Sequence, residues 1–464
     1  MSKFKTVYHI IKESVTGTDM DFTTGKIGKA IILLSIPMVL EMVMESVFIL
    51  VDIWFVSRLG TNAVTAVGIT ESVMSFVYAV AVGLGVATTA VIARRIGEHK
   101  KEKASEAAVQ AIITGIVISG VIAVIGLFFA DDLLKIMGAD SEVVKIGKSY
   151  TSIMFSGNIV IMLLFIINAI FRSSGDAAVS MKVLWLANIL NIILDPIFIF
   201  GFGPVPALGV KGAAIATNIG RGIAVAYQLY ILFKGSKRIQ LTKDHIKLDF
   251  PVIRKLLNLS KGSIFQNIIG TASWVGLVRI ISEFGSAAVA GYTIAIRIIL
   301  FVLLPAWGLS NAAGTLVGQN LGASQAGRAE RSAWITGSFN LIFMAVVNVI
   351  LILFPEPFVK FFINDTAAIA VGVSALQYMC FGFIVYAFGM VMIQSLNGSG
   401  DTITPLIINI ISFWFIELPV AYFLAMHTQL NERGVFIAII FSTVTLTILS
   451  TFIFKRAKWK LNKV

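Results

Sequence analysis

Charged residues are scarce in this sequence, and their scarcity limits the class of protein. Asp, Glu, Lys and Arg make up only 13% of the 464 residues, whereas hydrophobic residues make up 57% and the mean hydropathy is +0.89. A soluble fold cannot bury that much apolar surface, so we expect a polytopic membrane protein. The net charge of +12 does not indicate nucleic-acid binding, because the basic residues gather at the ends of apolar segments, where they set membrane topology.

Cysteine and histidine are also rare, which limits the chemistry available. Cys380 is the single cysteine, so no internal disulfide can form, and we interpret it as a packing residue. The four histidines are scattered, and the acid pair Asp131-Asp132 has no partner pair. A membrane enzyme such as a prenyl- or acyltransferase would need a clustered acid pair for Mg²⁺ or a His-centred motif. The sequence therefore argues against an enzyme, and we expect no cofactor.

Long hydrophobic runs, by contrast, fill the chain. A membrane-spanning helix needs about 20 apolar residues, and by that measure we expect about twelve spans. The longest polar interruption follows the sixth span, so we predict an N-lobe at 1–233, a cytoplasmic linker at 234–253 and a C-lobe at 254–464. Basic residues concentrate in both tails, in the loop after the second span and in the linker, which predicts a plasma (inner) membrane protein with both termini cytoplasmic. The expected cores are 28–56, 63–92, 107–130, 146–171, 179–202, 208–233, 254–282, 287–316, 332–354, 368–396, 403–426 and 433–454.

The two halves of the chain repeat each other at a constant offset in numbering. The offset is 225 for three matching segments and drops to 222 near the end of each half, which pairs Asp195 with Glu417. Because each half has six spans, we expect an all-α fold of two six-helix bundles, related by a pseudo-two-fold axis along the membrane normal. Such bundles with a central cavity are typical of transporters, and we see no ring of filter residues that would favour a channel. The matching segments are Leu59–Val64 with Phe284–Val289, Ile96-Gly97 with Leu321-Gly322, and Ser174–Asp176 with Ser399–Asp401.

An ionisable residue lies in the middle of the apolar run at 186–203. Asn188, Asn191 and Asp195 follow at i, i+3 and i+7, so they share one stripe of a helix. A charged side chain inside a bilayer costs about 2.5–3.5 kcal/mol on insertion scales, so this stripe should face the protein interior or a wet cavity. Close packing of the sixth span would bring Thr217 near it. The set suits a proton or a hard monovalent cation; a satisfied contact between packed helices is the alternative.

The first span carries its own acidic stripe. Glu41, Glu45 and Asp52 follow at i, i+4 and i+11, which places them within about 40° of one another on a helix. Three such carboxylates suit a proton or cation site; alternatively, Glu41 and Glu45 only line a watery vestibule. The second half is poorer in acid, with Glu417 as its one mid-span carboxylate. Further candidates for cation or substrate lining, weaker because such residues often only join helices, are Glu71, Asn158, Asn188, Gln266 and Glu417.

Several motifs together resemble the multidrug and toxic compound extrusion (MATE) family, over essentially the whole chain. The pattern is closest to the archaeal and DNA-damage-inducible branches of that family. The motifs are Val51-Asp52 with Arg58-Leu59-Gly60 and Ala63-Val64, Arg172–Asp176, Asn191 with Leu194-Asp195-Pro196, and Gly209–Ala214 with Ala216-Thr217.

The resemblance implies efflux of organic, often cationic and aromatic, compounds in exchange for H⁺ or Na⁺. By motif position, Asp52, Asn191, Asp195 and Thr217 match the N-lobe cation site of those branches, and they are also the candidate Na⁺ ligands. The expected partners are small organic molecules, the coupling ion and membrane lipid, with no nucleic acid, and we expect a monomer. A flippase for lipids or lipid-linked oligosaccharides, from the same superfamily, is the alternative. It would need a cavity rich in Arg and Lys, for which Arg279 and Arg297 are the nearest candidates.

Overall fold

The computed structural model describes residues 3–236, 238–462 and 464. Residues 1–2 of the predicted N-lobe, residue 237 of the predicted linker and residue 463 of the predicted C-lobe lie outside the description. Within the described residues the fold is all-α, apart from one isolated bridge between Phe202 and Val205. The predicted fold class is therefore confirmed.

Each of the twelve predicted spans corresponds to one helix or to two or three helical segments in succession. The fourth predicted span is the pair α5 and α6, and the eleventh is α14, a π-helical stretch (η3) and α15 in succession. The helices of the first half are α1 (Lys3–Thr16), α2 (Ile27–Ser57), α3 (Thr61–Gly97), α4 (Lys101–Ile136), α5 (Ser141–Ser156), α6 (Asn158–Ser174), α7 (Ala177–Phe200) and α8 (Val210–Lys234). Those that follow are η1 (Lys243–His245), α9 (Phe250–Ile281), η2 (Ser282–Phe284), α10 (Ser286–Gly322), α11 (Ala326–Leu353), α12 (Pro355–Lys360), α13 (Thr366–Gly398), α14 (Ile403–Asn409), η3 (Ile410–Glu417), α15 (Leu418–Met426), α16 (Glu432–Lys455) and η4 (Lys458–Leu461).

Most of these helices are long and apolar enough to cross a bilayer. In the described part of the chain, ten helical segments have the length and composition of a membrane span. The number is eleven if α5 and α6 form one span; they are bent by 42° at their junction. The remaining predicted span is α8, which carries Lys211, Arg221 and Lys234 and packs against α7.

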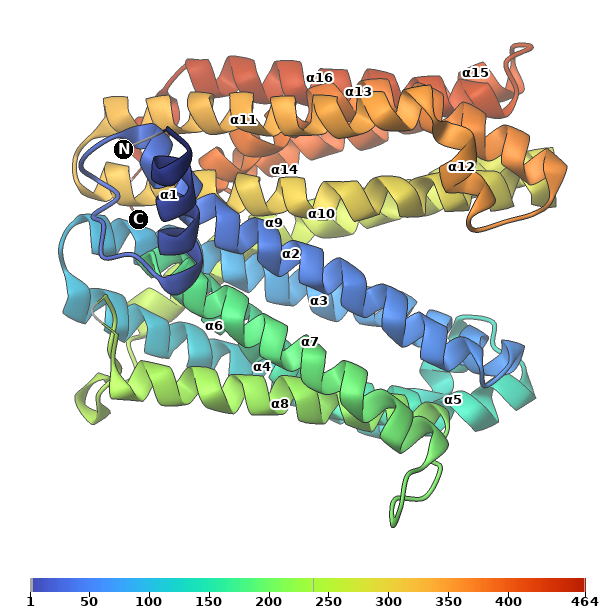
Figure 1. Ribbon diagram of the computed structural model, residues 1–464, viewed down its shortest axis with the longest axis horizontal. Coiled ribbons are helices and arrows are strands. Elements are labelled where there is room, and N and C mark those ends of the chain that lie inside the picture. The colour runs from blue at the N-terminus through green and yellow to red at the C-terminus, as the bar shows by residue number, and fades with distance from the viewer. Residues whose placement is uncertain (1–2, 237, 463) are drawn as a thin grey trace.

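The helices form two bundles that converge at one end and diverge at the other (Figure 1). Helices α2 to α8 make one bundle and α9 to α16 make the other; we call them the N-lobe and the C-lobe. Both termini and α1 lie at the end where the lobes converge, whereas α5 and α12 lie at the opposite end. The predicted start of the C-lobe at residue 254 falls inside α9, which already begins at Phe250.

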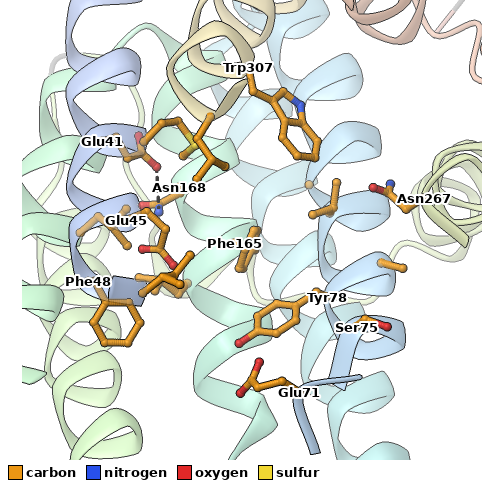
Figure 2. A pocket seen from close by; sticks show the side chains of 18 of the residues that line it. Glu41, Glu45, Phe48, Glu71, Ser75, Tyr78, Phe165, Asn168, Asn267 and Trp307 are labelled. Atoms are coloured by element: carbon orange, nitrogen blue, oxygen red, sulfur yellow. Dashed lines mark hydrogen bonds between the residues drawn. The ribbon is translucent and has the colours of Figure 1, made fainter. Parts of the chain in front are cut away.

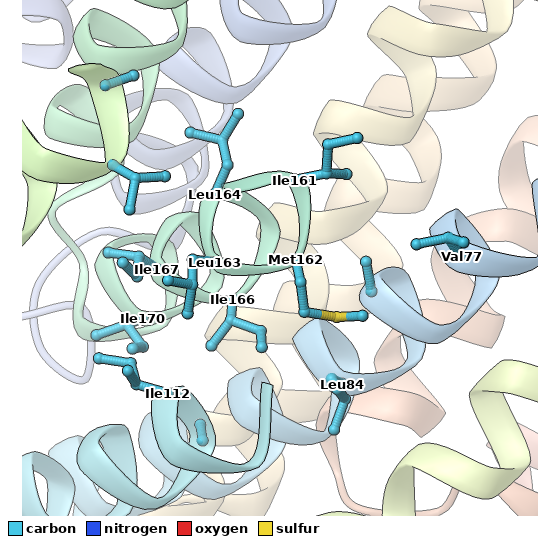
Figure 3. Packing of buried hydrophobic residues seen from close by; sticks show 14 of the residues in the cluster. Val77, Leu84, Ile112, Ile161, Met162, Leu163, Leu164, Ile166, Ile167 and Ile170 are labelled. Carbon is cyan, nitrogen blue, oxygen red and sulfur yellow. The ribbon is translucent and has the colours of Figure 1, made fainter. Parts of the chain in front are cut away.

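The N-lobe is held together by α6, which is apolar on almost every side. Its residues Ile161 to Ile170 pack against Val77 and Leu84 of α3 and Ile112 of α4 (Figure 3). Ile166, Ile167 and Ile170 are fully buried. A helix that is hydrophobic all round belongs in the interior of a bundle, and from there α6 carries its polar residues Asn168 and Arg172 to the wall between the lobes.

The repeat seen in the sequence is a repeat of backbone geometry. Helices α3 and α10 occupy 61–97 and 286–322, so their starts and their ends keep the same offset as the sequence motifs. Gly60 and Gly285 precede these two helices with φ of 97° and 94°. Positive φ is readily adopted only by glycine, which explains why the sequence keeps glycine at both places.

The lobes touch where the two repeat-related helices cross. A Cβ added to Gly97 of α3 would lie 1.9 Å from the Gln319 carbonyl oxygen, and one added to Gly322 of α10 would lie 2.2 Å from the Arg94 carbonyl oxygen. Only glycine permits the two backbones to come so close. We call this crossing of Gly97 and Gly322 the closed end.

Hydrogen bonds between the lobes reinforce the closed end. Arg94 of the N-lobe donates from Nη2 to the carbonyl oxygens of Ser399, at 3.4 Å, and Asn462, at 2.9 Å. In return, Gln319 of the C-lobe donates from Nε2 to the carbonyl oxygen of Ser173 at 2.7 Å. Arg94 and Gln319 occupy matching positions of the repeat. In each lobe, the side chain at this position therefore donates to backbone carbonyls of the other lobe.

The segment that joins α1 to α2 also bridges the lobes. Arg328 of α11 donates to the carbonyl oxygens of Thr24 and Gly25, both at 2.7 Å, while Arg238 donates to that of Met20 at 2.7 Å. Phe22 between these contacts is buried, in an apolar cluster with residues of both lobes. The N-terminal segment is thus part of the contact that holds this end together.

The helix bounds correct the pairing of Asp195 with Glu417. Asp195 follows the first residue of α7, Ala177, by 18 positions, whereas Glu417 follows Ile403 by 14. The drop in offset to 222 occurs in the connection after each helix, which spans 201–209 in the first half and 427–431 in the second. Glu417 therefore lies about one helical turn nearer to the start of its span than Asp195 does.

Candidate transport cavity and ion site

A cavity of about 720 Å³ lies between the lobes (Figure 2). The N-lobe wall comes mainly from α2, α3 and α6, and the C-lobe wall from α9, α10 and α13. Acidic residues stand on the first wall, while Trp307 and Asn267 stand on the second. The volume is in the range that holds one drug-sized molecule. The polar and aromatic residues that line it include Glu41, Glu45, Asp52, Glu71, Tyr78, Phe165, Asn168, Arg172, Thr217, Arg221, Asn267, Arg297, Trp307, Asn311, Gln394 and Asn397.

The four residues predicted as the cation site come together at the edge of this cavity. The Asn191 amide lies between Asp195 and Thr217, and its orientation follows from these neighbours. With Nδ2 toward the carboxylate it donates to Asp195 Oδ2 at 2.6 Å, and its Oδ1 accepts from the hydroxyl and the backbone N–H of Thr217, both at 3.0 Å. Spacing on the sequence predicted the Asp195 stripe, and the packing of α7 on α8 brings Thr217 to it.

The carboxyl groups of Asp52 and Asp195 are within hydrogen-bond reach of each other. Asp52 and Thr217 line the cavity, whereas Asp195 is fully buried behind them. Two carboxylates can approach this closely only when a proton or a cation lies between them. The arrangement therefore has one carboxyl facing the cavity and a second enclosed by the lobe.

Glu41 is an internal ion-pair partner. It is 1% exposed, and its Oε1 accepts from Arg172 Nη1 at 2.8 Å while its Oε2 accepts from the Ser180 hydroxyl at 2.9 Å. Asn168 adds a donor at 3.3 Å, drawn in Figure 2. This carboxylate lines the cavity, but groups of its own lobe satisfy it fully, so it is not a free acid.

Arg221 of α8 is a residue that the sequence reasoning missed. It is 6% exposed and lies 3.5 Å from Glu45 Oε1, donates to the Tyr78 hydroxyl at 3.3 Å and stacks over Phe48. Glu45 also accepts from Asn188 at 3.1 Å. The sequence pointed to Arg279 and Arg297 as the nearest basic candidates for the cavity, but Arg172 and Arg221 also lie in spans and line it, whereas Arg279 does not. The signal was available, since Arg221 is the one charge in the middle of an otherwise neutral run.

The weaker candidates separate into cavity residues and packing residues. Glu71 lines the cavity and accepts from Tyr150 at 3.4 Å. Asn158 is buried and donates to the carbonyls of Ser119 and Phe155, which joins helices away from the cavity. The remaining two candidates also bond within their lobe: Gln266 with Asn397 and Thr402, and Glu417 with Ser273 at 2.6 Å and Ser442 at 2.8 Å.

Comparison with known proteins agrees with this architecture. The sequence profile of the MatE family matches the chain twice, over residues 37–197 and 263–423, once in each lobe. The chain belongs to the MatE family. The resemblance noted from the sequence motifs is thereby confirmed.

Individual MatE proteins are similar over nearly the full length. The protein named "Probable multidrug resistance protein NorM" in Thermotoga maritima is 28% identical over 439 residues, covering 94% of both chains. A solved transporter from Pyrococcus furiosus, described as having a binding pocket of reversed polarity, superimposes with a TM-score of 0.89 at 28% identity and covers 95% of this chain and 98% of its own. A multidrug resistance MATE transporter solved in an outward-facing conformation also superimposes with a TM-score of 0.89 at 28% identity, and the match covers 94% of this chain and 97% of its own.

Membership in the MatE family has three consequences. The protein is a multi-pass membrane transporter of small molecules, its relatives support multidrug efflux, and the enzyme alternative is removed because members of this family are transporters.

Proposed function

We propose that this MatE protein is a secondary antiporter that exports organic cations with aromatic rings in exchange for H⁺ or Na⁺. The observation that carries the proposal is the contact between Asp52 and Asp195 at the edge of the cavity between the lobes. A pair of carboxyls that needs a proton or cation between them changes its shape and charge when that ion leaves. Such a pair can couple ion binding to the arrangement of the helices that carry it.

The coupling site consists of Asp52, Asn191, Asp195 and Thr217. Asp52 and Thr217 meet an ion that enters from the cavity, and Asn191 connects Thr217 to Asp195. A proton would sit between the two carboxyls, whereas Na⁺ would use the same carboxylate, amide and hydroxyl oxygens. Ion binding draws α2 toward α7 and α8, which narrows the cavity on the N-lobe side and displaces the exported molecule.

Alternating access follows from the two lobes. With both termini in the cytoplasm, the closed end faces the cytoplasm and the diverging end faces outward, so the structure corresponds to an outward-facing form. The closed end has to separate for the inward-facing form, in which the site releases its ion and takes a new substrate molecule.

The cavity lining supports an aromatic, positively charged substrate. Tyr78, Phe165 and Trp307 offer flat surfaces for stacking and cation–π contact. Glu71 and Asp52 place negative charge on the N-lobe wall. An organic cation would gain from both features, while a small inorganic ion would use only the carboxylates.

The test is transport by purified protein in proteoliposomes. A fluorescent organic cation is supplied, and its movement is driven first by a sodium gradient and then by a pH gradient. Wild type should respond to at least one gradient, which also names the coupling ion. The isosteric variant Asp195→Asn should lose that response while its thermal unfolding profile stays that of a folded protein.

Two results would overturn the proposal. Transport by Asp195→Asn at the wild-type rate would show that the carboxyl pair does not couple the ion. No response of wild type to either gradient, across several dyes, would favour the flippase alternative and direct the assay to fluorescent lipids.

A further inference from the structure

Within the described part of the chain, Arg297 of α10 is a cation without a partner on the C-lobe wall of the cavity. It lines the cavity and its side chain is exposed there. Among the described residues it makes no ion pair and no hydrogen bond, whereas Arg172 and Arg221 on the opposite wall are held by Glu41 and Glu45.

Its place in the helix makes an unpaired charge costly. Arg297 lies eleven residues after the start of α10 at Ser286, which is about 16 Å along the helix axis. Arginines near helix ends can extend to the membrane surface, but one this far inside a span normally faces a partner or a wet cavity. The position therefore indicates a binding function.

An acid lies at the matching depth on the other wall. The repeat relates α3 to α10, so Glu71 corresponds to Ile296, next to Arg297. Glu71 accepts only from the Tyr150 hydroxyl in the described part of the chain, and it forms no ion pair with Arg297. The cavity is therefore polarised across its width, negative on the N-lobe and positive on the C-lobe. Tyr78 lies next to Glu71 in Figure 2, and Phe165 and Trp307 line the same cavity farther from it.

We propose that Arg297 binds an anionic group of the exported molecule, and that the preferred substrates are zwitterionic aromatic compounds bearing a carboxylate. The guanidinium presents a planar fork of donors that matches a carboxylate in two parallel hydrogen bonds. The cationic end of the same molecule then faces Glu71, and its rings stack on the aromatic lining. This inference rests on the proposed function, because it requires the central cavity to hold the exported molecule.

The test uses two dyes with the same ring system. Rhodamine 110 carries a free carboxylate and is zwitterionic, whereas rhodamine 123 is its methyl ester and is a cation. Binding to the purified full-length protein is measured by fluorescence polarisation, and transport is measured in proteoliposomes. The variants are Arg297→Gln, which removes the charge, and Arg297→Lys, which keeps the charge and loses the fork. Arg279→Gln is the matched control, since Arg279 is exposed and pairs with Glu283 away from the cavity.

Wild type should bind rhodamine 110 more tightly than rhodamine 123. Arg297→Gln should weaken the binding of rhodamine 110 at least tenfold and leave the binding of rhodamine 123 within threefold of wild type. Arg297→Lys should bind rhodamine 110 with an affinity between those of wild type and Arg297→Gln. Arg279→Gln should change neither dye.

The inference is overturned if Arg297→Gln weakens both dyes equally or neither, or if wild type prefers the ester. In those cases continued ion-driven transport of rhodamine 123 would leave the proposed export of organic cations intact. If wild type binds and transports neither dye, the proposed function fails, and the role of Arg297 fails with it.

Discussion

The same place in the two lobes is occupied by an ion pair in one and by two amides in the other. Glu41 and Arg172 of the N-lobe lie 2.8 Å apart, and at the matching positions of the repeat Gln266 and Asn397 of the C-lobe exchange hydrogen bonds at 3.2 and 3.3 Å. Both pairs join the first long helix of a lobe to its fourth span. The repeat has therefore kept a polar contact at this position while its charge has diverged.

The same divergence runs along the first long helix of each lobe. Asp52 of α2 lines the cavity, whereas the matching residue of α9 is Leu277, which is fully buried and apolar. The one mid-span acid of the C-lobe, Glu417, is enclosed by two serine hydroxyls and does not reach the cavity. We infer that the N-lobe contributes the ion chemistry, whereas both lobes contribute surfaces for substrate recognition, the C-lobe through Trp307 and Arg297.

The largest effect on transport should come from replacing the cavity-facing acid of the N-lobe with the residue that the C-lobe has at the matching position. Asp52→Leu copies Leu277 and removes the carboxyl that faces the cavity, so ion-driven dye transport should fall about 100-fold or more, equivalent to about 2.7 kcal/mol. Glu417→Gln in the C-lobe should stay within threefold of wild type. Initial rates in proteoliposomes measure both.

The isosteric Asp52→Asn serves as a second variant if Asp52→Leu folds poorly, and it should show the same loss. Equal losses in the Asp52 and Glu417 variants would contradict the assignment of ion chemistry to one lobe.

A second prediction concerns the ion pair and its amide counterpart. Arg172→Asn, which copies Asn397, leaves Glu41 buried without its cation and should destabilise the protein by about 3–5 kcal/mol. The double variant Glu41→Gln/Arg172→Asn reproduces the C-lobe pair and should recover most of that loss. Unfolding in mixed micelles, followed by tryptophan fluorescence, gives the free energies. A double variant as unstable as the single one would show that the two lobes do not tolerate the same pair.

Much of the fold could be predicted from the sequence, because the physical signals are local. Apolar runs of about 20 residues define spans, and repeated glycines such as Gly60 and Gly285 mark turns that require positive φ. Each predicted span therefore has a helix. The register of Glu417 was wrong because the change of offset lies in a connection, where sequence spacing carries no information about helix length.

The candidate site was predictable only in part. Helical spacing brings Asn188, Asn191 and Asp195 to one stripe, and the structure keeps them together. Spacing within one helix cannot say which residues of other helices face it. The pairing of Glu41 with Arg172, and of Glu45 with Arg221, depends on how different helices pack, so these acids could not be recognised as neutralised.

A third prediction tests whether the lobes are mechanically equivalent even though they are chemically different. Gly97→Ala and Gly322→Ala each place a methyl group against a backbone carbonyl of the other lobe, so each should weaken the closed end by about 1–3 kcal/mol. Distances between spin labels across that end should shift toward the separated form in both variants. Gly120→Ala is the control, because a Cβ at Gly120 meets nothing within 4 Å. A shift in only one of the two variants would mean that the contacts of Gly97 and Gly322 do not contribute equally to the stability of the closed end.

The smallest expected effect on stability comes from removing one hydroxyl group near the buried acid of each lobe, and the two removals should differ in their effect on transport. Thr217 contacts Asn191 beside the carboxyl pair and lines the cavity, whereas Ser442 donates to the enclosed Glu417 at 2.8 Å. Ser442→Ala removes one of two donors to a carboxyl, so it should lower the free energy of unfolding by about 1 kcal/mol and leave transport unchanged. Thr217→Ala should cost a similar amount of stability but also raise the ion concentration needed for half-maximal transport. The measurement is an ion titration of dye transport beside an unfolding curve for each variant. An altered ion dependence in Ser442→Ala would place Glu417 in the coupling chemistry and remove the division between the lobes.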